Sequence, residues 1–237
     1  MTIERIHEEL LKLGDKKRAE NEKRYLKSPY FFYGVRVPEL RRIVKNYKSI
    51  DFRSAVDLFH KLWNSGNHEE MSFALFLLST FAKNNPAETW KLILENIDKA
   101  KTWDHIDELS AHILAEILND NYGFVKEIKE LSESLNPWRR RASIVATCFL
   151  IKNNKIDLTL RLAEKLVYDK DIYVQKGAGW MLREVGKKNR LSLRESLMMH
   201  LDMKAMAFSY ATEKMKEMRE IRKEHIKSRT KSSAPSK

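Results

Sequence analysis

The sequence repeats a helix-ending pattern at a nearly constant interval. Segments that end in Asn recur at residues 82–85, 118–121, 151–154 and 186–189, as Ala-Lys-Asn-Asn, Leu-Asn-Asp-Asn, Ile-Lys-Asn-Asn and Gly-Lys-Lys-Asn. Their final Asn residues are 36, 33 and 35 positions apart. Asn often ends a helix because it tolerates the left-handed backbone conformation. An interval of about 35 residues holds one shorter and one longer helix, which predicts paired-helix repeats of the HEAT or armadillo kind.

The rest of the chain also favours helices. Only seven Gly and five Pro occur in 237 residues, whereas sheet proteins need many turns. Pro38, Pro86 and Pro137 each open a helical pattern, where the missing N–H costs little. We therefore predict an all-α fold, an α-α superhelix or solenoid. Amphipathic patterns predict helices over residues 3–13, 40–47, 52–63, 71–83, 89–96, 106–118, 125–135, 139–152, 158–167, 174–188, 192–201 and 204–222.

The charge of the chain is divided between two parts. Lys and Arg number 45 against 33 Asp and Glu, a formal charge of +12, which predicts an anionic partner. Residues 214–237 carry half of it, with nine Lys or Arg and three Glu. No linker rich in Gly, Pro or Ser interrupts the remainder. We expect one repeat domain over residues 1–213, and a basic helix end with a disordered tail over residues 214–237.

Several classes of protein are excluded. One Cys rules out a disulfide scaffold, a Cys-ligated zinc site and a four-Cys iron–sulfur cluster. The longest uncharged stretch, Met71–Ala82, is too short to span a membrane, and the N-terminus lacks a signal-peptide core. There is no His pair at metal-binding helical spacing and no phosphate-binding Gly loop. We expect neither a metal nor another cofactor.

The segment around Trp103 and Asp107 is the first candidate for chemistry. The two residues are four apart, so a helix places them on one face. A Trp can pack on a sugar or a base, and a carboxylate beside it can stabilise a positive transition state or orient a water. The alternative is structural, because acids such as Asp104 or Asp107 commonly satisfy the first turn of a helix.

Two further segments carry cations beside aromatic residues. In the run after Pro137, Arg141 shares a helical face with Trp138, and Arg suits phosphate; a solvated basic helix start is the alternative. One repeat further on, Gly177 and Gly179 suggest a close approach of another backbone or a ligand. Candidate phosphate contacts there are Lys176 and Arg183, while the pattern alone favours Trp180 as a core residue.

Near the N-terminus, cations alternate with aromatic residues. This combination suits nucleic acid, and a hydrophobic anchor between helices is the alternative. The residues are Arg24, Tyr25, Lys27, Tyr30, Phe31, Phe32 and Tyr33.

Taken together, these segments resemble the DNA alkylation repair family, the AlkD-like DNA glycosylases, over roughly residues 20–190. The motifs that carry the resemblance are Arg24-Tyr25-Leu-Lys with Phe31-x-x-Gly34-x-x-x-Pro38, Trp103-Asp-x-x-Asp107, Trp138-x-x-Arg141-Ala, and Gln175-Lys-x-x-Gly179-Trp180-x-Leu-Arg183-Glu184. The resemblance implies a HEAT-like solenoid that holds double-stranded DNA in a concave basic groove. It also implies a monofunctional base excision enzyme that hydrolyses the N-glycosidic bond of cationic alkylated purines, 3-methyladenine and 7-methylguanine, without base flipping. A monomer in the prokaryotic cytoplasm would fit this role.

Carried over by position, Trp103, Asp107 and Trp180 match the catalytic cleft of the family. Arg141 matches its DNA-backbone contact, and Tyr25 matches an aromatic residue beside the cleft. The full candidate DNA-binding set is Arg141, Tyr25, Tyr173, Lys176, Arg183 and Arg140. The chain departs from the family pattern at Ile172 and Tyr173, where the family has two aromatics, and at Thr102, which precedes Trp103 in place of a second Trp.

Two other functions compete with the glycosylase. One is a noncatalytic HEAT-repeat module that binds damaged or branched DNA, and Asp107 beside two Trp residues argues against it. The other is a protein-interaction scaffold, which the clustered cations at residues 139–141 argue against.

Overall fold

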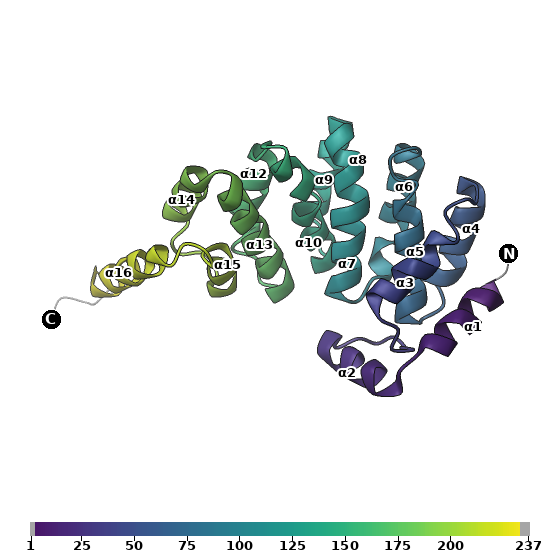
Figure 1. The fold of residues 1–237 in the computed structure, drawn as a ribbon. Coiled ribbons are helices and arrows are strands. Elements are labelled where there is room, and N and C mark those ends of the chain that lie inside the picture. Colours follow the sequence, from purple (N-terminus) through teal and green to yellow (C-terminus); the bar gives the residue numbers. More distant parts are fainter. Residues whose placement is uncertain (1–2, 233–237) are drawn as a thin grey trace. The chain divides into compact units, whose positions relative to one another are not determined.

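The computed structural model describes residues 3–232 and confirms the all-α class (Figure 1). Within these residues the secondary structure consists of helices, and the one β-bridge, between Phe31 and Asn67, is isolated. Contacts divide the chain into two compact units, Met1–Asp120 and Asn121–Lys237. The expected division at residue 213 stays a prediction. No helix of the described part is long and apolar enough to cross a membrane.

The N-terminal unit is organised around one buried helix. Its helices are α1 (Ile3–Leu13), α2 (Lys16–Leu26), α3 (Val37–Lys45), α4 (Phe52–Trp63), α5 (His68–Ser79), α6 (Pro86–Asn96), α7 (Trp103–Leu109) and α8 (Ala115–Asp120). Nearly the whole of α5 is buried, as expected for a helix that is apolar around its circumference. It packs against α3, α4 and α7, so residues at its start support the start of α7.

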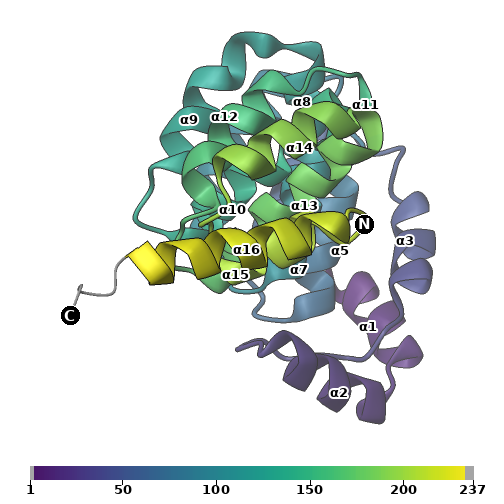
Figure 2. The same cartoon turned by 90° about the vertical axis from the view of Figure 1, so that its left-hand side faces the viewer.

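The C-terminal unit continues the pattern of paired helices. Its helices are α9 (Val125–Ser132), α10 (Pro137–Val145), α11 (Cys148–Lys152), α12 (Asp157–Leu166), α13 (Ile172–Lys188), α14 (Arg190–Met199), α15 (Ala205–Ala211) and α16 (Glu217–Ser232). The long helix α13 packs against α10, α12, α14 and α15. Figure 2 shows α16 as one continuous helix near the C-terminus.

The repeating Asn residues act in two different ways. Asn154 has a φ of 60°, so it ends α11 in the left-handed conformation that was expected. Asn121 and Asn189 instead have extended backbones and cap the next helix, accepting hydrogen bonds from the amides of Gly123 and Ser192. The Asn residues therefore do mark helix boundaries, but Asn85, Asn121 and Asn189 each stand at the start of the next helix, and Asn189 also ends α13.

The structure differs from the predicted helices in number or continuity at four places. Helix α2 was not predicted, because its sequence has no apolar stripe and buries only Leu26; Asp15 caps it by accepting from the amide of Arg18 at 2.8 Å. The predicted helix over 106–118 starts at Trp103 and is interrupted by a π-helical turn, Ser110–Leu114. The predicted helices over 139–152 and 204–222 each divide into two, and α16 extends to Ser232. Residues 233–237 of the expected disordered tail lie outside the described part.

The loop between α2 and α3 is held by a buried carboxylate. Glu69, only 2% exposed, accepts hydrogen bonds from the amides of Tyr33, Gly34 and Val35 at 3.1, 2.6 and 3.1 Å. Gly34 has a φ of 84°, and a Cβ there would lie 2.0 Å from the carbonyl oxygen of Asp15. Only glycine fits this position.

The substitution Gly34→Ala should therefore destabilise the fold strongly. We expect a loss of about 3 kcal/mol, from ~1 kcal/mol for the left-handed backbone and ~2 kcal/mol for the clash, measured by urea unfolding. Gly66 is the matched control, since its φ is 75° but nothing lies within 4 Å of a Cβ there. Equal losses in the two variants would show that the contact with Asp15 does not constrain the loop.

Candidate nucleic-acid interface

The N-terminal unit brings three of the predicted site residues together. Trp103 is the first residue of α7 and Asp107 lies one turn later, and both are partly exposed. The Tyr25 ring, 73% exposed at the end of α2, meets the Trp103 ring edge-on with centroids 6.0 Å apart. The predicted shared face of Trp103 and Asp107 thus lies on one helix, beside the aromatic residue that was expected there.

Tyr30 fixes the segment that leads into α7. Its hydroxyl donates to the carbonyl of Lys99 at 2.5 Å and accepts from the amide of Lys101 at 2.9 Å. Burial raises the pKa of Tyr30 to about 12, so the phenol keeps the proton that it donates. This clamp determines where α7, and with it Trp103, begins.

A second support lies under the first turn of α7. His68, at the start of α5, is 2.8 Å from a carboxylate oxygen of Asp104 through Nε2. Its ring stacks between Phe32 and His105, with centroids 4.4 and 4.2 Å away. Burial raises the pKa of Asp104, but the hydrogen bond from His68 and the electrostatic interactions with His105 and His68 together outweigh burial and hold the pKa well below its usual range. Burial lowers the pKa of His105 to about 3, which keeps its imidazole neutral.

Within residues 3–232, His68, Asp104 and His105 are the one cluster whose ligand atoms lie close enough for a metal ion, all within 4.8 Å. A metal ion binds an imidazole nitrogen near the plane of the ring. The His68 and His105 rings are stacked at 4.2 Å with an interplanar angle of 19°, so their planes do not converge on a common point. The geometry favours a hydrogen-bonded support rather than a metal centre.

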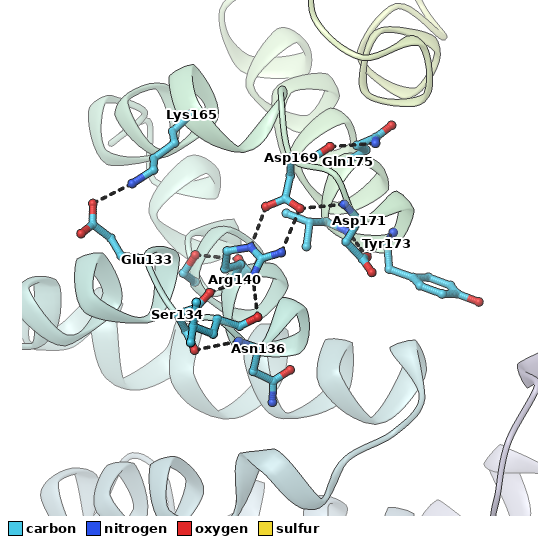
Figure 3. Close-up of polar contacts among 12 residues, drawn as sticks. Glu133, Ser134, Asn136, Arg140, Lys165, Asp169, Asp171, Tyr173 and Gln175 are labelled. Carbon is cyan, nitrogen blue, oxygen red and sulfur yellow. Dashed lines mark hydrogen bonds and ion pairs between the residues drawn. The ribbon is translucent and has the colours of Figure 1, made fainter.

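In the C-terminal unit, Arg140 turns inward (Figure 3). Its guanidinium binds Asp169 through two hydrogen bonds of 2.6 and 2.9 Å, and Nη1 donates to the carbonyls of Ser134 and Leu135. Both side chains of the ion pair are nearly buried, at 11% and 8% exposure. Arg140, predicted to bind DNA, therefore joins the segment before α10 to the segment before α13.

Arg141 is also buried, at 5% exposure. Its Nη1 donates to the carbonyl of Tyr173 at 2.5 Å, and its side chain packs on Gly177, where a Cβ would lie 3.3 Å from Cγ and Nη1. The close approach at Gly177 is thus made by the side chain of Arg141, whereas the prediction was another backbone or a ligand. At Gly179 a Cβ would lie 2.3 Å from the carbonyl oxygen of Ala207, which brings α15 against α13.

The partly exposed face at the start of α13 carries Tyr173 and Lys176. The Tyr173 ring lies 5.1 Å from that of Trp138, and Lys176 Nζ lies 5.6 Å from the Tyr173 centroid and 6.0 Å from that of Tyr210. The structure therefore groups one cation with three aromatic rings on this unit.

Arg183 and Trp180 lie further along α13. Arg183 pairs with Glu213 and, at 3.6 Å, with Glu184, so its charge is already compensated. Trp180 is partly exposed. It belongs to the C-terminal unit, and its predicted grouping with Trp103 and Asp107 stays a prediction.

Sequence reasoning did not identify the supports of the site. His68 and Asp169 belong to no sequence motif, and the sequence predicts only a capping role for Asp104. The available signal for Asp169 was chemical, since three cations at the start of α10 require a nearby anion.

Removing Asp169 should destabilise the protein in a pH-dependent way. Burial by itself would raise the pKa of Asp169. The hydrogen bonds from Arg140 and from the amide of Asp171 together have the larger effect, so the pKa lies below its usual value. The stabilisation that this ion pair gives is complete above about pH 3.9, the pKa of Asp in the unfolded chain. It is lost as the pH falls through the lower pKa of Asp169 in the folded protein. We expect Asp169→Ala to lose about 3 kcal/mol at pH 7, because Arg140 remains buried without its partner.

The measurement is urea unfolding at pH 7 and below pH 4, where the difference from the wild type should shrink. The control is Glu133→Ala, which removes an exposed ion pair with Lys165 and should change stability little. A difference between wild type and Asp169→Ala that is independent of pH would contradict the role of the ion pair.

Known structures share this fold. A predicted DNA alkylation repair enzyme from Enterococcus faecalis matches with a TM-score of 0.74 and 16% identity, over 85% of this chain and 96% of that chain. AlkD2 from Streptococcus mutans matches with a TM-score of 0.61 and 19% identity, over 83% and 97% of the two chains. The protein smu.31 from Streptococcus mutans matches with a TM-score of 0.59 and 21% identity, over 74% of this chain and 90% of that chain.

At these identities the likeness to solved structures shows the fold alone, and no curated protein sequence matches the chain. The sequence itself is more informative. The family model for DNA alkylation repair enzymes matches residues 6–215, nearly all of the chain before α16. The chain therefore belongs to the DNA alkylation repair enzyme family.

Proposed function

We propose that this protein is a DNA glycosylase that removes cationic alkylated purines, such as 3-methyladenine and 7-methylguanine, from double-stranded DNA. The observation that carries the proposal is the presentation of Trp103 and Asp107 on one partly exposed face at the start of α7, beside Tyr25. The hydrogen bonds of Tyr30 and His68 hold this turn in place. Membership of the repair family supports alkylated DNA as the substrate.

The chemistry of the proposed reaction matches these residues. Alkylation at N3 or N7 makes the purine a cation and therefore a good leaving group. Breaking the N-glycosidic bond leaves oxocarbenium character on the deoxyribose, and water completes the hydrolysis. The Asp107 carboxylate can stabilise that positive charge and orient the water. Trp103 can pack on the sugar and offer its negative π-face to the developing cation. The resemblance assigns the same role to Trp180.

We assign the binding of the DNA backbone to two kinds of residue. Lys176 and Tyr173 are partly exposed and can contact phosphate and sugar directly. Arg141 is buried and donates to the carbonyl of Tyr173. A phosphate contact from Arg141 therefore depends on the first turn of α13, which also carries Tyr173. Arg140 and Arg183 are paired with carboxylates, and their proposed part is to hold the surrounding segments. The proposed enzyme acts as a cytoplasmic monomer without a cofactor and without base flipping.

Base release from methylated DNA tests the proposal directly. Purified protein should release 3-methyladenine or 7-methylguanine from methylated double-stranded DNA, measured by chromatography of the free bases. Asp107→Asn should lower the rate about 100-fold or more, because it removes the charge but keeps the shape of the side chain.

The matched control is Asp57→Asn, which alters an exposed carboxylate in the middle of α4. It should retain wild-type base release. If wild-type protein binds methylated DNA but releases no base, and Asp107→Asn binds equally, the protein is a noncatalytic DNA-binding module instead.

A second experiment tests the assignment of Lys176. Each phosphate contact contributes about 0.9 to the slope of log K against log salt, so Lys176→Ala should flatten that slope by about one contact. Fluorescence anisotropy of a labelled duplex across salt concentrations measures it. Lys188→Ala, at the exposed end of the same helix, should leave the slope unchanged. An unchanged slope in Lys176→Ala would remove this residue from the interface.

A further inference from the structure

Phe31 is an exposed aromatic residue on a fixed backbone. Its side chain is 74% exposed, whereas its amide donates to the carbonyl of Gly66 at 3.0 Å and its carbonyl accepts from the amide of His68 at 2.9 Å. Glu69 fixes the three residues from Tyr33 onwards. The ring is therefore held in solvent by an ordered segment, and none of the reactions proposed above uses it.

A cavity of about 420 Å³ lies beside this ring. It is formed within the N-terminal unit by the end of α1, one face of α2 and the aromatic loop. Its lining residues are Leu11, Gly14, Lys16, Ala19, Glu20, Lys23, Phe31, Phe32 and Tyr33. The volume lies in the range of small-molecule sites, about 300–1,000 Å³, and apolar and aromatic side chains provide much of the wall.

The charges around the cavity select the kind of ligand. Lys23 Nζ lies 5.4 Å from the centroid of the Phe31 ring, and Lys16 lines the same cavity. Residues 16–27 contain six Lys or Arg and two Glu. Glu20 is the one acidic residue in the lining, against two lysines. An exposed aromatic face beside lysines is the combination that binds a nucleobase by stacking and its phosphate by charge. A purely apolar partner would gain nothing from the cations.

We propose that Phe31, Lys23 and Lys16 bind an unpaired nucleobase of the DNA together with its phosphate. The base stacks on the Phe31 ring, and the flexible Lys23 side chain moves from the ring to the phosphate. The proposal rests on the proposed function only in that DNA is the ligand. It adds a position outside the Trp103 and Asp107 site that holds a base already unpaired in the DNA, as in a bulge, so the reaction at the alkylated purine still needs no base flipping.

The test compares two duplexes that differ by one unpaired 2-aminopurine. The full-length protein should bind the bulged duplex about tenfold more tightly than the fully paired one, the size of one base–aromatic stack, and should quench the 2-aminopurine fluorescence. Phe31→Ala and Phe31→Leu should lose both effects and still bind the paired duplex within about twofold of wild type. Phe31→Trp should keep both effects, because it restores an aromatic face.

Leu191→Ala is the matched control, since Leu191 is equally exposed, at 73%, on the C-terminal unit. It should behave as wild type. A bulge preference that survives in Phe31→Ala overturns the proposal, as does a wild-type protein without any preference. The proposal is also overturned if Phe31→Ala leaves bulge binding intact but abolishes self-association in sedimentation, because the patch is then an interface between copies.

The two proposals fail in different experiments. Asp107→Asn should keep the bulge preference and the fluorescence quenching. If base release is absent but Phe31-dependent quenching is present, the glycosylase proposal fails and the nucleobase site stands. If base release depends on Asp107 but Phe31→Ala changes neither binding nor quenching, the nucleobase site fails and the glycosylase stands.

Discussion

The buried carboxylate of Glu69 is the constraint on which the candidate site of the N-terminal unit depends. By accepting from three consecutive amides, it gives the loop after α2 a single conformation without regular secondary structure. The four aromatic residues of that loop then serve different purposes. Tyr30 clamps the start of α7, Phe32 stacks on His68, Tyr33 donates to Glu70 at 2.6 Å, and Phe31 stays in solvent.

The C-terminal unit shows why a run of cations does not by itself mark a binding surface. Arg140 and Arg141 lie in the first turns of α10, where the helix dipole disfavours positive charge. Asp169 and the carbonyl of Tyr173 compensate them inside the protein. Among the cations predicted to bind DNA, Lys176 is partly exposed and lies beside aromatic rings rather than in the arginine run. Burial, more than the number of charges, decides which cations can meet a phosphate.

The sequence predicts features that depend on local spacing well. The bounds of α1 and α4 and the Pro-led starts of α6 and α10 follow from periodicity and helix-start rules. The shared face of Trp103 and Asp107 follows in the same way, because both lie on one helix. Helix α2 was missed because its sequence is mainly polar. It is defined by a cap at Asp15 and a cationic surface, and hydrophobic periodicity gives no signal for either.

The supports of the site could not be predicted, because each joins residues that are distant in sequence. His68 and Asp104 are 36 residues apart, and Tyr30 and Lys99 are 69 apart. Spacing rules apply within a helix, whereas these contacts depend on how α5, α7 and an irregular loop pack together. A reaction that needs only a carboxylate and an aromatic face has few chemical groups to recognise in a sequence. Its efficiency then depends on how rigidly those groups are placed, which is a property of the long-range contacts.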